Sequence, residues 1–484
     1  MRLQAFIASL AISAPVWASL EGYEGESLEI LERDVCVIGG GASGTYSAIR
    51  LQQMNQTVAL IEKESRLGGH VNTYVDAGTN QTYDYGVSLW VRRLRAVLCS
   101  LLCCSPAYQA QRNETAVTDF FDSLGIPVTS VQTGNGPVSL YANFANATRV
   151  SPTVLASGNI TTSLQTYLVQ LAKYPYLTNG FNLPDPVPED LLLPFGEFVK
   201  KYDLDAVAFT IYSYNQGIGN ILAQPTIYVL KYFPASTVLA AFTGGFISTA
   251  RHNNQEVYDR ALAQLESDAL LNTKVIWISR HNDGVKTLVS TPSGLKMIRS
   301  SRLLITIPPK LEKLDFLDMD AVEHSLFGQF NHSYYWNGLI KDAGIPDNTT
   351  ITNIDPAAPY NIPSLPGAYA FGYTGLPRIH NVYYSSPDAL PDAFVKADIL
   401  ATDARLAKSF GFGSDRMPEF VAFNAHNPFE LTVPPNAIRS GFYSRLEALQ
   451  GRRSTWWTGA TWQAQDSSAI WNFTEHVILP QLVA

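Results

Sequence analysis

The stretch from residue 34 to residue 70 constrains the fold of this chain more than any other part of it. Residues 34–38 form a short apolar, β-branched run, which predicts a buried parallel strand. Residues 39–44 follow directly and complete the pattern G-x-G-x-x-G, and a stretch of helical composition then leads to a second apolar run that ends on Glu62. An acid at this place can accept hydrogen bonds from an adenosine ribose. Together these features predict a βαβ unit that binds a dinucleotide.

Each glycine of the loop has a defined structural role in such a unit. Gly39 permits the tight turn, Gly41 lets a pyrophosphate approach the backbone, and Gly44 lets the helix pack closely on the strand. The helix N-terminus offers unpaired N–H groups and the positive end of its dipole, so Ala42 and Ser43 are also predicted to contact the cofactor. A lone G-x-G-x-x-G is often only a glycine-rich turn, but the complete unit favours a binding site.

The residues after the second strand indicate which dinucleotide is bound. Residues 62–70 read E-K-E-S-R-L-G-G-H, which resembles the E-x₃-R-x-G-G segment of the FAD-binding amine oxidase superfamily. In that family the paired glycines pass close to the cofactor and the arginine lies near its phosphates. No second G-x-G-x-x-G follows a strand elsewhere in the sequence, so the resemblance implies FAD alone. Within this segment it implies cofactor contacts for Glu62, Lys63, Arg66, Gly68, Gly69 and His70.

The resemblance covers nearly the whole chain and implies its division into domains. The expected fold is α/β, with a Rossmann-like FAD-binding domain of the amine oxidase and glutathione reductase type, interleaved with an α+β substrate domain. The FAD-binding domain is expected to comprise residues 33–150, 241–309 and 441–484. The substrate domain is expected to comprise residues 151–240 and 310–440, and alternating, tyrosine-rich runs in the second segment predict a mixed sheet.

The N-terminus predicts entry into the secretory pathway. Residues 1–18 combine a basic start, an apolar core and small residues at a cleavage site, which is typical of a signal peptide. That run is too short to span a membrane, and no later run is long and apolar enough to do so. Sequons for N-glycosylation occur at Asn55, Asn80, Asn113, Asn146, Asn159, Asn331, Asn348 and Asn472. We therefore expect a secreted glycoprotein.

Residues 91–112 do not fit their surroundings. The segment is basic, holds three of the four cysteines, and interrupts an otherwise continuous pattern. A translated intron is the preferred hypothesis, with no contribution to the flavin site, and a surface loop with a disulfide is the alternative. The cysteine spacing predicts no metal site. Outside this segment no basic tract occurs and the net charge is only −8, so nucleic acid is not expected as a partner.

The C-terminal region is expected to return to the flavin. Residues 455–460 predict a strand entering a tight turn, and Ser467 and Ser468 are expected to cap a helix that ends at Pro480. In the amine oxidase family this last helix points at the flavin pyrimidine, where its dipole stabilises negative charge. The resemblance implies further cofactor contacts at Gly86, Val275, Gly459, Ala460, Ser468 and Ala469.

The resemblance also implies the chemistry. FAD removes a hydride equivalent from a small-molecule substrate, and molecular oxygen is the expected electron acceptor. The sequence also resembles fungal flavoproteins of the β-cyclopiazonate dehydrogenase type, which implies a nitrogen-containing secondary metabolite as substrate. Two departures argue against a simple amine oxidase: Lys310 and Lys313 come too early for the family's lysine, and Ala469 stands near its aromatic cage position. A carotenoid- or prenyl-type desaturase and a non-catalytic flavin-binding protein are the alternatives.

Three residues are candidates for contact with the reacting part of the flavin. His70 either makes a polar contact or carries a covalent 8α-histidyl bond to FAD. Trp457 and Tyr443 either line the flavin face or pack in the core. The sequence leaves both pairs of alternatives open.

Overall fold

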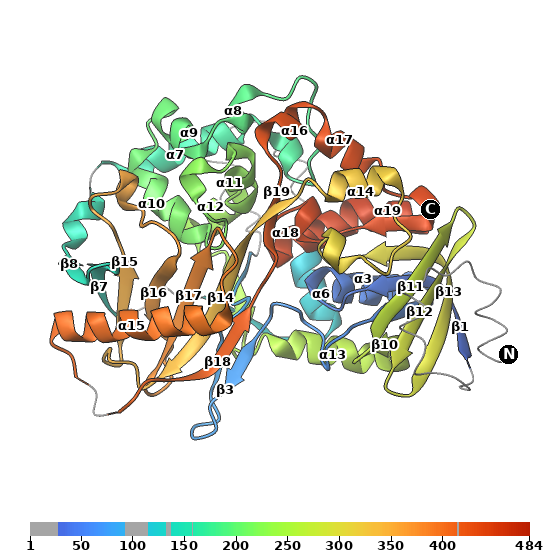
Figure 1. Cartoon of the computed structure of the whole chain (residues 1–484), viewed down its shortest axis with the longest axis horizontal. Helices are drawn as coiled ribbons and strands as arrows, with labels where there is room; N and C mark the ends of the chain where they lie inside the picture. The colour runs from blue at the N-terminus through green and yellow to red at the C-terminus, as the bar shows by residue number, and fades with distance from the viewer. Residues whose placement is uncertain (1–27, 92–114, 132–136, 157, 414–415) are drawn as a thin grey trace.

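The computed structural model describes residues 28–91, 115–131, 137–156, 158–413 and 416–484. Two large sheets dominate the molecule, and the chain passes back and forth between them (Figure 1). Among the described residues, no helix has the length and apolar character needed to cross a bilayer. The predicted signal peptide, residues 1–18, lies outside the described residues.

A seven-stranded sheet contains the predicted βαβ unit. Its order is β10-β2-β1-β13-β12-β11, with β20 also pairing with β13. The strands are β1 (Glu29–Ile38), β2 (Val58–Ile61), β10 (Ala269–Leu270), β11 (Lys274–His281), β12 (Gly284–Thr291), β13 (Gly294–Ile305) and β20 (Thr455–Trp457). β1 lies between β2 and β13, parallel to both, and its residues Val35, Cys36 and Val37 have no exposed surface. Parallel strands covered on both faces read as continuous apolar runs, as this one does.

The second sheet has eight strands and belongs to the substrate domain. Its order is β18-β14-β17-β16-β15-β7-β8, with β19 also pairing with β14. The strands are β7 (Val138–Asn143), β8 (Thr148–Val150), β14 (Asn331–Lys341), β15 (Thr349–Asn353), β16 (Gly367–Tyr373), β17 (Ile379–Ser386), β18 (Glu419–Ala425) and β19 (Phe429–Thr432). β15 and β7 are parallel and the other pairs antiparallel, so the sheet is mixed, as predicted.

The first domain boundary, expected at residue 150, is wrong. β7 pairs with β15 along five residues and β8 pairs with β7, so residues 138–150 belong to the eight-stranded sheet. These two strands are short, and β15, the partner of β7, lies about two hundred residues further along the chain. A pairing over that distance leaves no local signal in the sequence.

Helices cover both sheets. Helices α7 to α12 gather beside the eight-stranded sheet, while α15 lies across it (Figure 1). The helices are α3 (Ala42–Gln53), α6 (Ala116–Ser123), α7 (Ile160–Leu171), α8 (Glu189–Leu192), α9 (Phe195–Lys201), α10 (Asp205–Tyr214), α11 (Thr226–Tyr232), α12 (Ala235–Thr243), α13 (Gln255–Leu265), α14 (Ala321–Phe327), α15 (Asp392–Phe410), α16 (Pro435–Arg439), α17 (Phe442–Glu447), α18 (Ser467–Phe473) and α19 (Leu479–Val483).

Two small sheets complete the fold. β3 (Thr73–Val75) and β4 (Thr82–Asp84) form a hairpin, while β9 (Phe246–Thr249) pairs with both β5 (Trp90–Val91) and β6 (Val128–Ser130). Val91 was expected to begin a segment foreign to the fold, and that expectation is wrong for this residue. It pairs with Phe246, and its N–H donates to Ser468 Oγ (3.0 Å). The rest of that segment, residues 92–112, lies outside the described residues.

The C-terminal helix differs from its prediction at both ends. Asp466, rather than Ser467 or Ser468, caps α18, because its carboxylate accepts from the N–H groups of Ser468 (2.7 Å) and Ala469 (3.2 Å). Pro480 does not end the helix. A π-helical turn, Thr474–Ile478, follows α18, and α19 then begins with the proline in its first turn. A proline is tolerated there because first-turn N–H groups need no partner within the helix.

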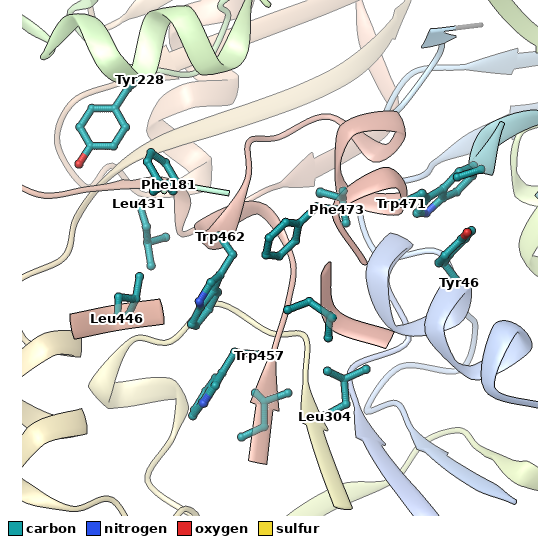
Figure 2. Close-up of a cluster of buried hydrophobic side chains, with 14 of the residues drawn as sticks. Tyr46, Phe181, Tyr228, Leu304, Leu431, Leu446, Trp457, Trp462, Trp471 and Phe473 are labelled. Carbon is teal, nitrogen blue, oxygen red and sulfur yellow. The ribbon is translucent and has the colours of Figure 1, made fainter. Parts of the chain in front are cut away.

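A core of large rings joins the C-terminal segment to the FAD-binding domain (Figure 2). Trp457 and Trp462 stack with their planes 15° apart and their centroids 5.6 Å apart. Trp471 stacks on Tyr46 of α3 (5.5 Å), and its indole N–H donates to the carbonyl oxygen of Ala42 (3.0 Å). These contacts fix α18 against the start of α3, where the cofactor is predicted to bind.

Candidate flavin site

Two glycines of the loop are required by the protein itself. Gly39 has φ +101°, a conformation that other residues rarely adopt. A side chain at Gly44 would place its Cβ 1.8 Å from the carbonyl oxygen of Gly39, far inside van der Waals contact. The strand and the helix can therefore approach as closely as they do only if residue 44 has no side chain. This confirms the packing role predicted for Gly44.

Gly41 is different, because the protein leaves room for a side chain there. A Cβ on Gly41 would come no closer than 3.9 Å to its nearest described neighbour, the Cα of Gly69, which is ordinary contact. Its φ of −74° is also one that any residue adopts. No described side chain caps α3, which starts at the next residue. A glycine with free space beside an uncapped helix N-terminus fits a pyrophosphate, so these residues fit FAD.

Glu62 lies under the glycine loop. Its two carboxylate oxygens accept from the N–H groups of Gly40 (2.7 Å) and Glu64 (2.8 Å). Its backbone oxygen accepts from the N–H of Thr273 (2.9 Å), which brings the start of β11 and the buried Val275 to the same edge of the sheet. Lys63, by contrast, is exposed and pairs with Glu64 (3.3 Å).

Arg66 holds the loop that carries the paired glycines. Its guanidinium donates to the carbonyl oxygen of Val71 (2.8 Å) and to the side chains of Gln255 (2.8 Å) and Asn72 (2.8 Å). Further bonds reach the carbonyl oxygens of Leu67 and Gly69. Gly69 has φ +54°, so this bend also needs a glycine. The arginine therefore acts as a clamp on residues 66–72, with its charge beside Gly69.

The backbone of His70 is in contact with Gly86, and its imidazole lies near the rings of His426 and Phe429. A Cβ on Gly86 would lie 2.1 Å from the carbonyl oxygen of His70, so the two backbones are in direct contact. The imidazole lies with its centroid 4.3 Å from that of His426 and 6.2 Å from the ring of Phe429. A contact between residues so far apart in sequence could not be foreseen from the chain.

We use the name aromatic wall for His426, Phe429, Tyr335 and Tyr383. Tyr335 contacts Phe429 (4.8 Å) and stacks with Tyr383 (6.1 Å). The four residues come from β14, β17, β19 and the turn before β19, and two of them, His426 and Phe429, are in ring contact with His70. The two tyrosines belong to runs that predicted a sheet, but His426 and Phe429 carried no signal of a site.

The two imidazoles are uncharged at neutral pH. Burial, with the charge of Arg66 as a smaller cause, lowers the pKa of His70 to about 4. Burial also holds the pKa of His426 well below its usual range, and His70 and Arg66 add to this effect. His70 is an exposed residue, yet the protein atoms that surround its ring disfavour the charged form and so lower its pKa.

The C-terminal residues meet the glycine loop. A Cβ on Gly459, which has φ +116°, would lie 3.2 Å from the carbonyl oxygen of Thr306 and 3.4 Å from Ser43 Oγ. Ala460 follows it, half-buried. The N–H groups of Ser468 and Ala469, implied as flavin contacts, both donate to Asp466. Burial raises the pKa of Asp466. Sequence reasoning missed this acid because serines are equally good helix caps.

Trp457 and Tyr443 lie in the core, which was the packing alternative for both. Trp457 has no exposed surface, and its ring packs on Trp462. Tyr443 stacks on Phe181 (3.9 Å) and donates to the hydroxyl of Tyr228 (2.8 Å). Of the three candidates, His70 alone reaches the aromatic wall.

In the described part of the chain, no cluster of three His, Cys, Asp or Glu could hold a metal ion.

Comparison with known proteins agrees with this geometry. A model described as an NAD(P)-binding Rossmann-like domain matches residues 37–98. Solved structures that resemble the chain include a fatty acid isomerase from P. acnes, with a TM-score of 0.71 and 19% identity over 93% of this chain and 98% of that one. They also include an engineered putrescine oxidase, with a TM-score of 0.63 and 16% identity over 94% of this chain and 100% of that one. The chain therefore shares the fold of these proteins, in which a Rossmann-like cofactor-binding domain is interleaved with a second domain.

Curated relatives are similar along nearly their full lengths. The FAD-dependent oxidoreductase oblC of Cochliobolus heterostrophus is 36% identical, over 99% of this chain and 97% of that protein. The FAD-dependent oxidoreductase pigF of Monascus ruber is also 36% identical (94% and 92%), and β-cyclopiazonate dehydrogenase of Aspergillus oryzae is 30% identical (94% and 94%). This chain belongs to that family of FAD-dependent oxidoreductases and uses FAD.

Proposed function

We propose that this oxidoreductase removes a hydride equivalent from a small, neutral, nitrogen-containing metabolite that carries a planar ring system, in fungal secondary metabolism. The observation that carries the proposal is the aromatic wall beside His70. Ring faces at this spacing bind a flat, apolar ligand by stacking. FAD, when bound, supplies the hydride acceptor, and molecular oxygen would reoxidise it.

The charges around the aromatic wall favour a neutral substrate over a cationic amine. The two histidines are uncharged, and the hydroxyl of Tyr335 donates to the side-chain oxygen of Gln216 (3.0 Å). Asp84 lies near Tyr383, but it is engaged by the side chain of Thr73 and the N–H of Asn254, and burial raises its pKa to about 7. A buried carboxyl of that kind is a weak partner for an ammonium group.

Anaerobic bleaching of the flavin absorbance tests this proposal. Candidate substrates are mixed with the oxidised holoprotein: a neutral indole-bearing amide, an aliphatic diamine and a polyene. We expect bleaching by the first alone, and at least about tenfold slower bleaching in Tyr335→Leu, because that variant removes a stacking face. Bleaching by the diamine alone would contradict the proposed neutral substrate. Bleaching by the polyene alone would instead support a desaturase.

We also propose that His70 is joined covalently to FAD. Its neutral ring has a free lone pair at neutral pH, and Gly68 and Gly69 bring its backbone to the predicted cofactor path. Acid precipitation of the holoprotein tests the bond. We expect yellow colour in the pellet for the wild type and in the supernatant for His70→Ala. Colour released fully from the wild type would contradict the link and leave FAD binding intact.

The chain is further proposed to be a secreted glycoprotein. The signal-peptide pattern and the sequons support this, and six of the sequons, at Asn55, Asn80, Asn146, Asn159, Asn331 and Asn348, lie at exposed positions. N-terminal sequencing of protein from its native host should begin near residue 19, and a glycosidase should lower its mass. A chain that still starts at Met1 and resists the glycosidase would contradict the proposal.

A further inference from the structure

We propose that His426 is a positioning residue for His70, and that it accepts the proton that His70 loses when the flavin bond forms. The inference rests on the proposed covalent link. His426 lies more than three hundred residues from the FAD motif, in the turn between β18 and β19. It was not among the residues that the sequence singled out.

The geometry of the pair supports a positioning role. The two imidazole rings are 4.3 Å apart at 60°, and Phe429 packs against His70 at 24°. The backbone N–H of His426 donates to the carbonyl oxygen of Tyr335 (2.8 Å), which anchors the turn to β14. The ring of His70 thus contacts two rings of the aromatic wall. A nucleophile that is held in one orientation reacts faster than one that rotates freely.

The hydrogen bonding of His426 supports a role as proton acceptor. Its side chain is 5% exposed, and its Nε2 is buried without a hydrogen-bond partner among the described residues. A buried polar atom without a partner is costly, and such atoms tend to have a functional reason. Of the two ring contacts that His426 makes, the one with the imidazole of His70 is the closer, at 4.3 Å between centroids against 6.3 Å for Tyr335. An uncharged imidazole can accept a proton from its neighbour and release it later.

Bond formation releases two protons and two electrons. A bond forms between a ring nitrogen of His70 and the 8α carbon of the flavin, and one C–H bond of that methyl group breaks with loss of its proton to solvent. The remaining N–H proton of His70 passes to His426 Nε2. The two electrons enter the flavin ring, and molecular oxygen takes them up with two protons to give hydrogen peroxide. His426 then releases its proton to solvent, so the protons lost by the methyl group and by His70 balance the two that oxygen takes up, and His426 is unchanged by the reaction.

The test is the rate at which apoprotein mixed with FAD forms acid-stable flavin. We compare wild type, His426→Ala and His426→Phe, with His332→Ala as a matched control. His332 makes a similar tilted ring contact with Tyr334 (4.8 Å), outside the aromatic wall. Both His426 variants should bind FAD but form the bond at least about tenfold more slowly, since they lack the proton acceptor.

Chemical rescue separates this role from simple packing. Added imidazole should restore bond formation in His426→Ala, which leaves space for it, but not in His426→Phe. Wild-type rates in His426→Phe would overturn the inference, and so would slow variants that imidazole does not rescue. A wild type without acid-stable flavin would overturn the link and this inference together, while bleaching by substrate would still support the proposed oxidation.

Discussion

The two ends of the candidate site are built in opposite ways. At the glycine-loop end, backbone atoms define the geometry: Gly44 packs against Gly39 with no room for a methyl group, and Gly41 faces Gly69. At the other end, side chains from β14, β17 and β19 define it through the aromatic wall and His70. The first end is suited to phosphates, which every dinucleotide shares, and the second to features that differ between substrates.

The end of the site that holds the aromatic wall is also supported by a buried hydrogen-bond network around Lys231. Lys231 of α11 donates to the carbonyl oxygens of Leu177 (2.9 Å) and Gly180 (2.9 Å) and to the side chain of Gln463. Its fully buried ammonium ties the helical part of the substrate domain to the segment that precedes α18. Burial lowers the pKa of Lys231 to about 7 and raises that of the nearby Glu430 to about 8. Such a network is stable only while its members stay paired.

The largest expected effects are at the glycine-loop end. Gly44→Ala should prevent normal folding, because its Cβ would overlap the carbonyl oxygen of Gly39. Gly41→Val should fold like the wild type but lose FAD, with content lowered at least about tenfold, since its side chain occupies the pyrophosphate's place. Circular dichroism and the flavin-to-protein absorbance ratio measure both. Normal FAD content in Gly41→Val would contradict the assignment of the loop.

The next effect concerns the scaffold of the aromatic end. Lys231→Met should lower the free energy of unfolding by about 3 kcal/mol, because it leaves the buried carbonyl oxygens of Leu177 and Gly180 without their donor. Lys201→Met is the matched control: this exposed lysine pairs with Asp190 at the surface, and its loss should cost less than about 1 kcal/mol. Urea titration measures both. Equal costs for the two variants would show that the Lys231 network does not hold this end together.

How much the sequence predicts differs between the two ends for the same physical reason. The βαβ unit, its glycines and Glu62 lie within forty residues, so a local pattern sufficed to predict β1, α3, β2 and the cofactor. The pairing of His70 with His426 and of β7 with β15 depends on contacts across hundreds of residues. A helix cap is partly predictable: the sequence shows that a helix starts near residue 466, but Asp466 and the adjacent serines are about equally good caps, so it does not show which of them is used.

The smallest expected effect is a pH dependence of folding stability that arises from His70 and His426. Both imidazoles have folded-state pKa values below the ordinary value of 6.5, at about 4 for His70. Between about pH 6.5 and 4 the unfolded chain therefore binds more protons than the native one, and stability falls as the pH drops through this range. Apoprotein of His426→Phe should lose less stability than wild type between pH 7 and 5 in thermal melts. Parallel pH profiles would show that His426 is not held uncharged.

The account's central claim is that one FAD molecule joins the two ends, with its pyrophosphate at Gly41 and its flavin ring at the aromatic wall. A crystal structure of the FAD-bound protein measures this directly. We predict phosphate oxygens against the backbone of Gly41 and the start of α3, and the dimethylbenzene edge of the flavin in contact with His70. A flavin ring that lies away from both His70 and the aromatic wall would contradict the account.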